Sequence, residues 1–285
     1  ELGIVCDYGS HLMKEMELEI GGQRIDRHYG HWHSVYSQLT EFNPSKSQTT
    51  LFNRMCGNGE SIITDDADAT NAAANLQRGW TESGATTAMK GRFWIPLYFW
   101  FCRNPGLALP LIALQYHEVK VKVTFEDLAN LIVIDNTNDF SSGASGLLTS
   151  SVTSSSFDLW CDYIYLDTDE RRRFAQVSHE YLIEQLQFEN KSGGTMDLNF
   201  NHPVKELIWA GVRATATKTA AAENRIMERP AISGASTYQL KLNGHDRFKE
   251  RDYRYFTRTQ VWEHHTGYGC TQTSVPDTIA VYSFA

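Results

Sequence analysis

Three histidines form the pattern in this sequence that comes closest to a metal site. They are His28, His31 and His33, and on a β-strand His31 and His33 would share one face. A zinc site needs three or four such ligands that converge on one ion. Aromatic residues lie all around these histidines, which favours a packing or surface cluster over a metal site; they are Tyr29, Trp32 and Tyr36.

Other patterns that could carry chemistry are incomplete. Residues 57–61 lack the lysine of a phosphate-binding loop, and residues 142–146 have the wrong spacing for a nucleophile elbow. Residues 66–70 begin like a calcium loop, but Asn71 and Gln77 stand where that loop needs Gly and Glu. We interpret residues 66–70 as a loop that caps a helix.

The remaining polar pairs have simpler interpretations. Asp158 and Asp162 are four residues apart on one expected strand, which indicates an outward solvated face. His264 and His265 with Cys270 do not complete a ligand set. We therefore predict no catalytic residue, no cofactor and no metal site.

One modification site and one basic run stand out. Asn190 begins the only N-glycosylation sequon, Asn190-Lys191-Ser192, in an expected turn. The run Arg171-Arg172-Arg173 lies beside acidic residues, so we interpret it as a solvated linker instead of a phosphate site.

Composition excludes several classes of protein. The 285 residues carry a net charge of −8, which argues against direct nucleic-acid binding through a basic surface. The sequence shows no signal peptide, and charge and prolines interrupt its longest apolar tract, residues 93–114, so we expect a soluble protein. The five cysteines include no CxxC pair, and we expect Cys102 and Cys161 to be small core residues.

The hydrophobic pattern predicts an all-β fold. Apolar residues alternate with charged ones in Glu15–Ile20, Val119–Val123 and Met196–Asn201, which places them on one face of a strand. Asn71–Arg78 is the only segment that resembles a helix, and residues 40–90, 127–156 and 211–237 are expected to be long loops. Further strands are expected at Phe157–Leu166, Tyr181–Phe188, Val204–Ala210, Tyr238–Leu242 and Ile279–Phe284.

A short internal repeat suggests two similar β-sandwiches. Glu17–Gly22 resembles Gln239–Gly244, and both are a strand that ends in a turn pair, Gly-Gly or Asn-Gly. The match is short, so chance is a rival explanation. The charged stretch Asp167–Arg173 is the candidate junction between the two units.

Six motifs, taken in order, resemble the major capsid protein of nucleo-cytoplasmic large DNA viruses, and the algal-virus branch is the nearest. The most specific is the sixteen-residue run Asn104–Val119. The others are Leu18–Asp26, Asp162–Phe174, Tyr181–Phe188, Leu198–Pro203 and Leu242–Phe248.

The resemblance implies two consecutive antiparallel jelly rolls, both truncated in this chain. The expected units are a first jelly roll at 1–168, a linker at 169–176 and a second jelly roll at 177–285. Strands Phe93–Cys102 and Leu107–Leu114 would form core of the first unit. The N-terminal strands of the first unit and the C-terminal strands of the second are expected to be missing.

The resemblance also implies a function. Three copies would form a pseudo-hexagonal capsomer, and capsomers would tile an icosahedral virion shell assembled in the host cytoplasm. Expected partners are neighbouring capsomers, minor capsid proteins, an internal membrane beneath the shell and surface glycans. No catalytic residue is implied.

A carbohydrate-binding β-sandwich, lectin-like or spike, is the alternative, because jelly rolls host many functions. Its sugar-stacking candidates would be Trp32, Trp94, Trp100 and Trp262.

Overall fold

The computed structural model describes residues 2–4, 8–41, 51–56, 93–127, 131–134, 157–191, 193–210, 237–267, 269 and 279–284. The expected helix Asn71–Arg78, the calcium-like segment, residues 57–61, residues 142–146 and Cys270 lie outside the described residues.

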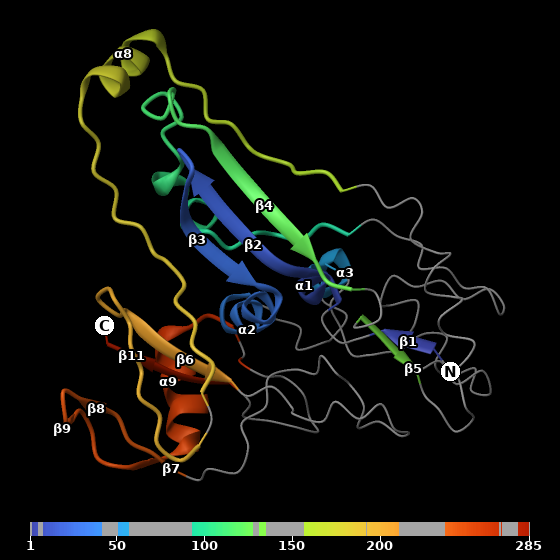
Figure 1. The fold of residues 1–285 in the computed structure, drawn as a ribbon, viewed down its shortest axis with the longest axis vertical. Coiled ribbons are helices and arrows are strands. Elements are labelled where there is room, and N and C mark those ends of the chain that lie inside the picture. The colour runs from blue at the N-terminus through green and yellow to red at the C-terminus, as the bar shows by residue number, and fades with distance from the viewer. Residues whose placement is uncertain are drawn as a thin grey trace.

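An antiparallel three-stranded sheet organises the first half of the chain (Figure 1). The central strand β2 (Met13–Ile20) pairs with β3 (Gln23–Tyr29) on one edge and with β4 (Val119–Phe125) on the other. Gly21 and Gly22 connect β2 to β3 with φ angles of 59° and 82°. Such positive angles suit a type I′ hairpin turn, so this predicted turn is confirmed.

One face of this sheet is the first hydrophobic core. Met16 and Leu18 of β2 are fully buried, and Phe99 and Trp100 pack against them in the same cluster. The three valines of β4 point to the same side, as the alternation of Val119–Val123 predicted. The sheet therefore has one apolar and one charged face.

The second half of the chain contributes most of a second, smaller core. Strand β6 (Glu206–Ala210) pairs antiparallel with β11 (Ile279–Ser283). A short π-helix, η2 (Tyr255–Thr259), leads into α9 (Gln260–His264), which contributes Val261 to this core. Ile279 and Val281 are fully buried there.

Short elements complete the described chain. Strand β1 (Leu2–Ile4) pairs with β5 (Ile132–Ile134), β7 (Thr237–Tyr238) with β10 (Arg251–Asp252), and β8 (Lys241–Leu242) with β9 (His245–Asp246). The short helices are α1 (Tyr8–Leu12), α3 (Leu51–Cys56), α5 (Trp100–Arg103) and the 3-10 turn η1 (Pro105–Leu107). The β8–β9 turn has φ angles of 51° at Asn243 and 82° at Gly244, so both turns of the internal repeat adopt the same conformation.

Helix α2 (Gly30–Thr40) lies between the two cores (Figure 1). His33 faces the first core through its contacts with His28 and Tyr98. Val35 and Leu39 belong to the second core, together with Val261 and β11. One helix therefore joins the two halves by burying different faces against each.

The second half also caps the end of α2. Three carbonyl groups at its C-terminus accept hydrogen bonds from residues 266–269: Leu39 from the Gly267 amide at 2.7 Å, Gln38 from the Gly269 amide at 2.9 Å and Thr40 from the Thr266 hydroxyl at 2.7 Å. The last carbonyls of a helix have no partner within it. This contact satisfies them from a segment more than two hundred residues away in sequence.

Several segments that we predicted as strands do not pair with another strand in the described residues. Residues Phe157–Leu166, Tyr181–Phe188 and Met196–Asn201 form no sheet with any other described residue. Strand Phe93–Cys102 is replaced by an extended segment that runs into α5, and Leu107–Leu114 by turns. An alternating sequence makes a strand only where a second strand supplies hydrogen-bond partners, and the described residues supply none here.

Other predictions are also corrected. Helices α2 and α8 (Thr168–Gln176) form where no helix was expected. Cys102 and Cys161 are exposed, although we expected core positions, because Cys102 lies in the short helix α5 and Cys161 lies on an unpaired segment; of the cysteines in the described residues, Cys56 is buried. Among described residues, no helix has the length and apolarity to cross a membrane.

Replacing Gly267 with alanine tests the cap on α2. An added Cβ would lie 2.4 Å from the Gln38 carbonyl oxygen and 2.5 Å from the Leu39 carbonyl carbon, so the backbone must move apart. We expect Gly267→Ala to lower the free energy of unfolding by about 2 kcal/mol or more, as overpacking does, measured by urea denaturation. Gly194→Ala is the matched control because a Cβ there meets nothing within 4 Å. An equal effect of the two variants would contradict the cap.

Candidate functional site

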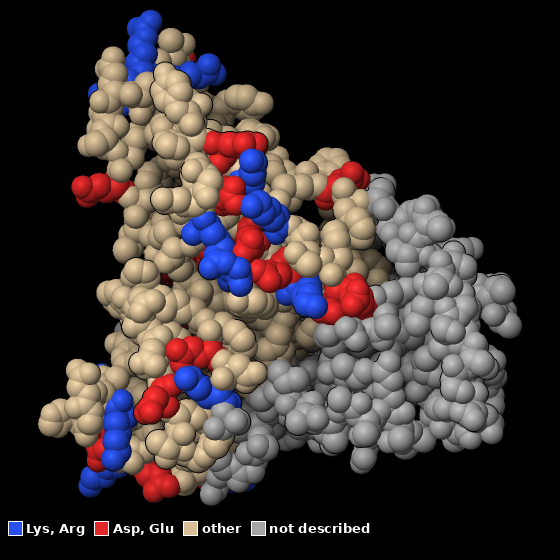
Figure 2. All heavy atoms as spheres, viewed as in Figure 1, with Lys and Arg blue, Asp and Glu red and all other residues tan. Residues whose placement is uncertain are grey.

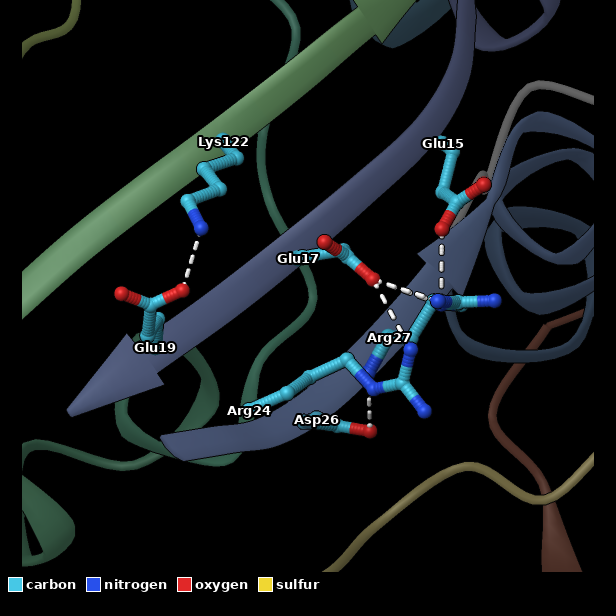
Figure 3. A network of polar contacts seen from close by, with 7 residues as sticks. All are labelled: Glu15, Glu17, Glu19, Arg24, Asp26, Arg27 and Lys122. Atoms are coloured by element: carbon cyan, nitrogen blue, oxygen red, sulfur yellow. Dashed lines mark hydrogen bonds and ion pairs between the residues drawn. The ribbon is translucent and has the colours of Figure 1, made fainter. Parts of the chain in front are cut away.

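The outward face of the sheet is a ladder of alternating charge. Its central row comes from β2 and is acidic, while the flanking rows from β3 and β4 are basic. Figure 2 shows acidic (red) and basic (blue) side chains side by side across the middle of the molecule, and Figure 3 shows the contacts of the ladder residues other than Lys120. The ladder consists of Glu15, Glu17, Glu19, Arg24, Arg27, Lys120 and Lys122.

Arg27 is the centre of the ladder (Figure 3). Its guanidinium lies 2.6 Å from a carboxylate oxygen of Glu15 and 2.6 Å from one of Glu17. The hydrogen bond from Arg27 is the main reason that the pKa of Glu17 lies below its usual value. Lys122 pairs with Glu19 across the other edge of β2. Each acidic group thus has a basic partner within the ladder.

The inward face of β3 carries the histidine cluster. The ring of His28 stacks on Phe99 at 4.4 Å between centroids, and its Nε2 lies 3.0 Å from a carboxylate oxygen of Asp26. His33 meets His28 edge-on at 5.8 Å and Tyr98 at 5.0 Å. The three polar side chains are buried in the first core.

The histidines pack and do not form a metal site among the described residues. His31 and His33 lie on helix α2, not on a strand, so they do not share a face as expected. No group of three or more possible metal ligands occurs in the described part of the chain. The expected aromatic packing is confirmed, since Trp32 contacts Tyr36 at 5.0 Å and His28 at 6.4 Å.

Asp26 and Ile25 join the sheet to the segment Tyr181–Phe188. The Leu186 amide donates a hydrogen bond of 3.1 Å to the carboxylate of Asp26, which also accepts the Arg27 amide at 2.8 Å. The side chain of Gln185 donates to the Ile25 carbonyl. These contacts hold the segment beside β3 without a strand ladder.

A second junction is charged. Arg103 donates to the Tyr36 hydroxyl at 2.7 Å and to Glu184 at 2.7 Å, and Lys205 donates to the other oxygen of Glu184 at 2.6 Å. Glu184 therefore neutralises cations from both halves of the chain. No short motif could have revealed this group, because Arg103 is 81 residues and Lys205 is 21 residues from Glu184 in the sequence.

Residues 157–166, which we call the apolar strap, are extended and largely solvent-exposed. Trp160 is 72% exposed and Tyr165 is 85% exposed, although alternation places their side chains on opposite sides of the extended segment. Tyr163 and Ile164 are exposed as well. Exposed apolar side chains therefore lie on both sides of the strap.

The structure also places the polar residues singled out in the sequence. Asp158, Asp162 and Asn190 are exposed, and Asn190 lies in irregular backbone. Arg171–Arg173 are exposed on α8, which agrees with a solvated face. The helix itself was missed, although Asp167 and Glu170 form the capping box that signals a helix start.

The tryptophans divide between core and surface. Trp100 is buried with 4% exposed, whereas Trp94 is 43% exposed and contacts Trp160 with tilted rings whose centroids are 5.4 Å apart. Trp262 is also exposed. They do not form one sugar-stacking platform, because Trp100 belongs to the first core.

Comparisons with known proteins identify relatives along the whole chain. A family described as "Major capsid protein N-terminus" matches residues 5–167, and one described as "Large eukaryotic DNA virus major capsid protein" matches residues 170–285. The major capsid protein of Pyramimonas orientalis virus is 44% identical over 266 residues, covering 90% of this chain and 54% of that protein. That of Phaeocystis pouchetii virus is 33% identical over 378 residues, covering 97% of this chain and 70% of that protein.

A solved structure of a virus capsid also matches the chain. The PBCV-1 virus capsid matches with a TM-score of 0.62 and 29% identity, covering 100% of this chain and 69% of that one. The chain spans about half the length of its Pyramimonas relative, 54%.

His33 should make the stability of the protein sensitive to acid. Burial, with a smaller contribution from His28, lowers the pKa of His33 from 6.5 to about 3. Between these values the unfolded chain binds a proton that the folded chain does not, so stability falls as the pH falls below 6.5. At about pH 5 the loss from this residue is about 2 kcal/mol.

The variant His33→Phe should remove this loss. Both ring nitrogens of His33 are buried without a hydrogen-bond partner among the described residues, so the substitution by phenylalanine removes no hydrogen bond. We expect a smaller difference in unfolding free energy between pH 7.5 and pH 5 than in the parent, measured by urea denaturation. Val35→Ala, on the same helix, should lower stability equally at both pH values. An unchanged pH dependence in His33→Phe would contradict the assignment.

Proposed function

Because the chain belongs to the major capsid protein family of large eukaryotic DNA viruses, we propose that it is a structural protein of an icosahedral virion shell. The observation that carries this proposal is the match to the PBCV-1 virus capsid, which covers 100% of this chain at 29% identity. The family is a structural capsid family, and we propose no catalytic residue.

We infer two consecutive jelly rolls, at residues 1–168 and 177–285, joined by a linker at 169–176. Two observations support this division. The two family matches meet between residues 167 and 170, at the start of α8. Each half also has a buried cluster of its own, although the second cluster includes Val35 and Leu39 of α2.

The apolar strap supports a larger sandwich than the described residues form. Its sequence alternates as a strand, and apolar residues lie on both sides of it. A strand inside the sheet of an antiparallel sandwich would bury one side against the core and pair both edges. We propose that in the complete protein further strands cover the strap, which fits relatives that extend beyond this chain.

The proposed assembly unit is a homotrimer. Two similar jelly rolls in each of three copies give six similar sides, which lets neighbouring capsomers meet through repeated contacts. Proposed further partners are minor capsid proteins and the membrane beneath the shell, and the proposed site of assembly is the host cytoplasm.

The oligomeric state tests this function. The full-length gene product should form a stable trimer by light scattering, with a hexagonal outline in negative-stain images, because a shell protein must associate with itself. A monomer at micromolar concentration together with specific binding on a glycan array would contradict the capsid function. That outcome would favour the carbohydrate-binding sandwich, for which the exposed Trp94–Trp160 pair is the supporting observation.

We also propose Asn190 as a glycosylation site on the virion surface, because it is exposed and begins a sequon. A glycan there should give a mass increase on the peptide that contains Asn190 in protein purified from virions. The increase should be absent in Asn190→Gln, while Asn199→Gln, outside any sequon, keeps it. An unmodified peptide from virions would contradict this site.

A further inference from the structure

The second half of the chain carries a basic patch on ordered backbone, between β9 and the helical segment that ends in α9 (Figure 1). Phe248, inside the patch, contacts the fully buried Phe256 with ring centroids 5.4 Å apart. Strand β10, also inside the patch, pairs with β7. These contacts fix the backbone that carries the charges. The patch consists of four exposed cations, Arg247, Lys249, Arg251 and Arg254.

Two of the four cations are held over aromatic rings. The guanidinium carbon of Arg251 lies 4.2 Å from the ring centroid of Tyr255, and that of Arg254 lies 5.3 Å from the centroid of Tyr253. A cation–π contact holds the side chain in place without neutralising its charge. The guanidinium groups therefore keep their hydrogen-bond donors for an anionic partner.

The patch has no carboxylate partner in the described part of the chain, although acidic residues are interspersed with it. Asp246 pairs instead with Lys241 at 3.6 Å. Glu250 accepts a hydrogen bond from a threonine hydroxyl of β7, and Asp252 accepts one from a backbone amide at 2.8 Å. In the ladder, by contrast, Arg27 pairs with two glutamates of its own chain. The cations of the patch thus remain without the partners that ladder cations have.

The charge of the patch is opposite to that of the chain as a whole. Residues 241–258 include six basic and three acidic residues, a net charge of +3, whereas the whole chain carries −8. A second copy of the chain therefore offers an excess of carboxylates. Because charges farther apart than about 8 Å are largely screened at physiological ionic strength, the patch acts through its own charge and not through the net charge of its chain.

We propose that the basic patch binds carboxylates of a second copy of this chain and so forms part of an interface between copies. The inference rests on the proposed function, because a shell protein must contact copies of itself. A guanidinium can donate two parallel hydrogen bonds to one carboxylate. Charged contacts of this kind fix the register of an interface and disfavour wrong pairings.

Charge reversal in the full-length protein tests the patch. The test variant is Arg247→Glu, Arg251→Glu and Arg254→Glu combined, and the matched control changes Arg171–Arg173 of the exposed helix α8 to Glu. Both variants change the net charge equally, so only the location differs. Analytical ultracentrifugation measures association of monomers into trimers and of trimers into larger assemblies. We expect the dissociation constant of at least one step to rise about tenfold or more in the test variant and to stay near the parent value in the control.

Cross-linking of the parent protein tests the same contact without a substitution in the arginines. A carbodiimide joins a lysine amine to a carboxylate that touches it, and a denaturing gel separates linked dimers from single chains. We expect peptides from the dimer band to include Lys249 joined to an Asp or Glu peptide. The variant Lys249→Arg should lose this link because it keeps the charge but not the amine. Lys205, which lies 2.6 Å from Glu184 of its own chain, should be linked in the single-chain band.

The inference is overturned if the charge-reversed variant associates as tightly as the parent, or if Lys249 is absent from the links in the dimer band. If the variant does not fold, as judged by circular dichroism, the cross-links of the parent decide. Patch-dependent binding to anionic lipid vesicles or to DNA, with unchanged self-association, would assign the patch to that partner instead. A parent that forms trimers while the inference fails leaves the structural function in place, whereas a monomeric parent contradicts both.

Discussion

Helix α2 is the element on which the arrangement of the two halves depends, because it is buried on opposite sides by different cores. His33 packs in the first core, while Val35 and Leu39 pack in the second. The glycine backbone at Gly267 approaches the end of α2 so closely that no side chain fits between them. Close approach allows the loop to satisfy the helix carbonyls that burial would otherwise leave without partners. Helix packing and helix capping therefore join the halves at one place.

The central sheet shows how one strand can serve both core and surface. Alternation along β2 sends Met16 and Leu18 to the core and the glutamates to the ladder. Because each glutamate pairs with a basic residue on a neighbouring strand, the charges of this face are partnered across the strands and the face suits contact with water. The apolar strap is the opposite case. Its aromatic side chains face solvent without such a balance, which is the observation behind the proposal that further strands cover it.

The sequence predicted what local periodicity and turn chemistry determine. Strands β2, β4 and β11 and both hairpin turns were found because alternation and the Gly-Gly and Asn-Gly pairs are local signals. Helix α2 was missed because His, Trp, Tyr, Ser, Val and Thr are weak helix formers, and its stability comes from packing on two cores. Residues 157–166 and 181–188 were predicted as strands but are unpaired in the described residues. An alternating pattern shows that a segment can form a strand, but it does not show which second strand would pair with it.

The candidate site was predictable only in part, for the same reason. The aromatic setting of the histidines was evident from adjacent residues, but their placement on a strand and a helix was not. The junction of Arg103, Glu184 and Lys205 joins residues distant in sequence, so only the folded chain reveals it. The exposure of Cys102 and Cys161 likewise reflects how the strap lies, whereas their apolar neighbours in sequence suggested a core.

The most direct test of this account is hydrogen exchange at the backbone amides of the strap. It compares the 285-residue chain with the full-length protein in its assembled state. If further strands cover the strap in a complete sandwich, the amides of residues 159–165 exchange rapidly in the chain alone and slowly in the assembled protein. Rapid exchange in both would contradict the double jelly roll, because the strap would then remain unpaired in the complete protein.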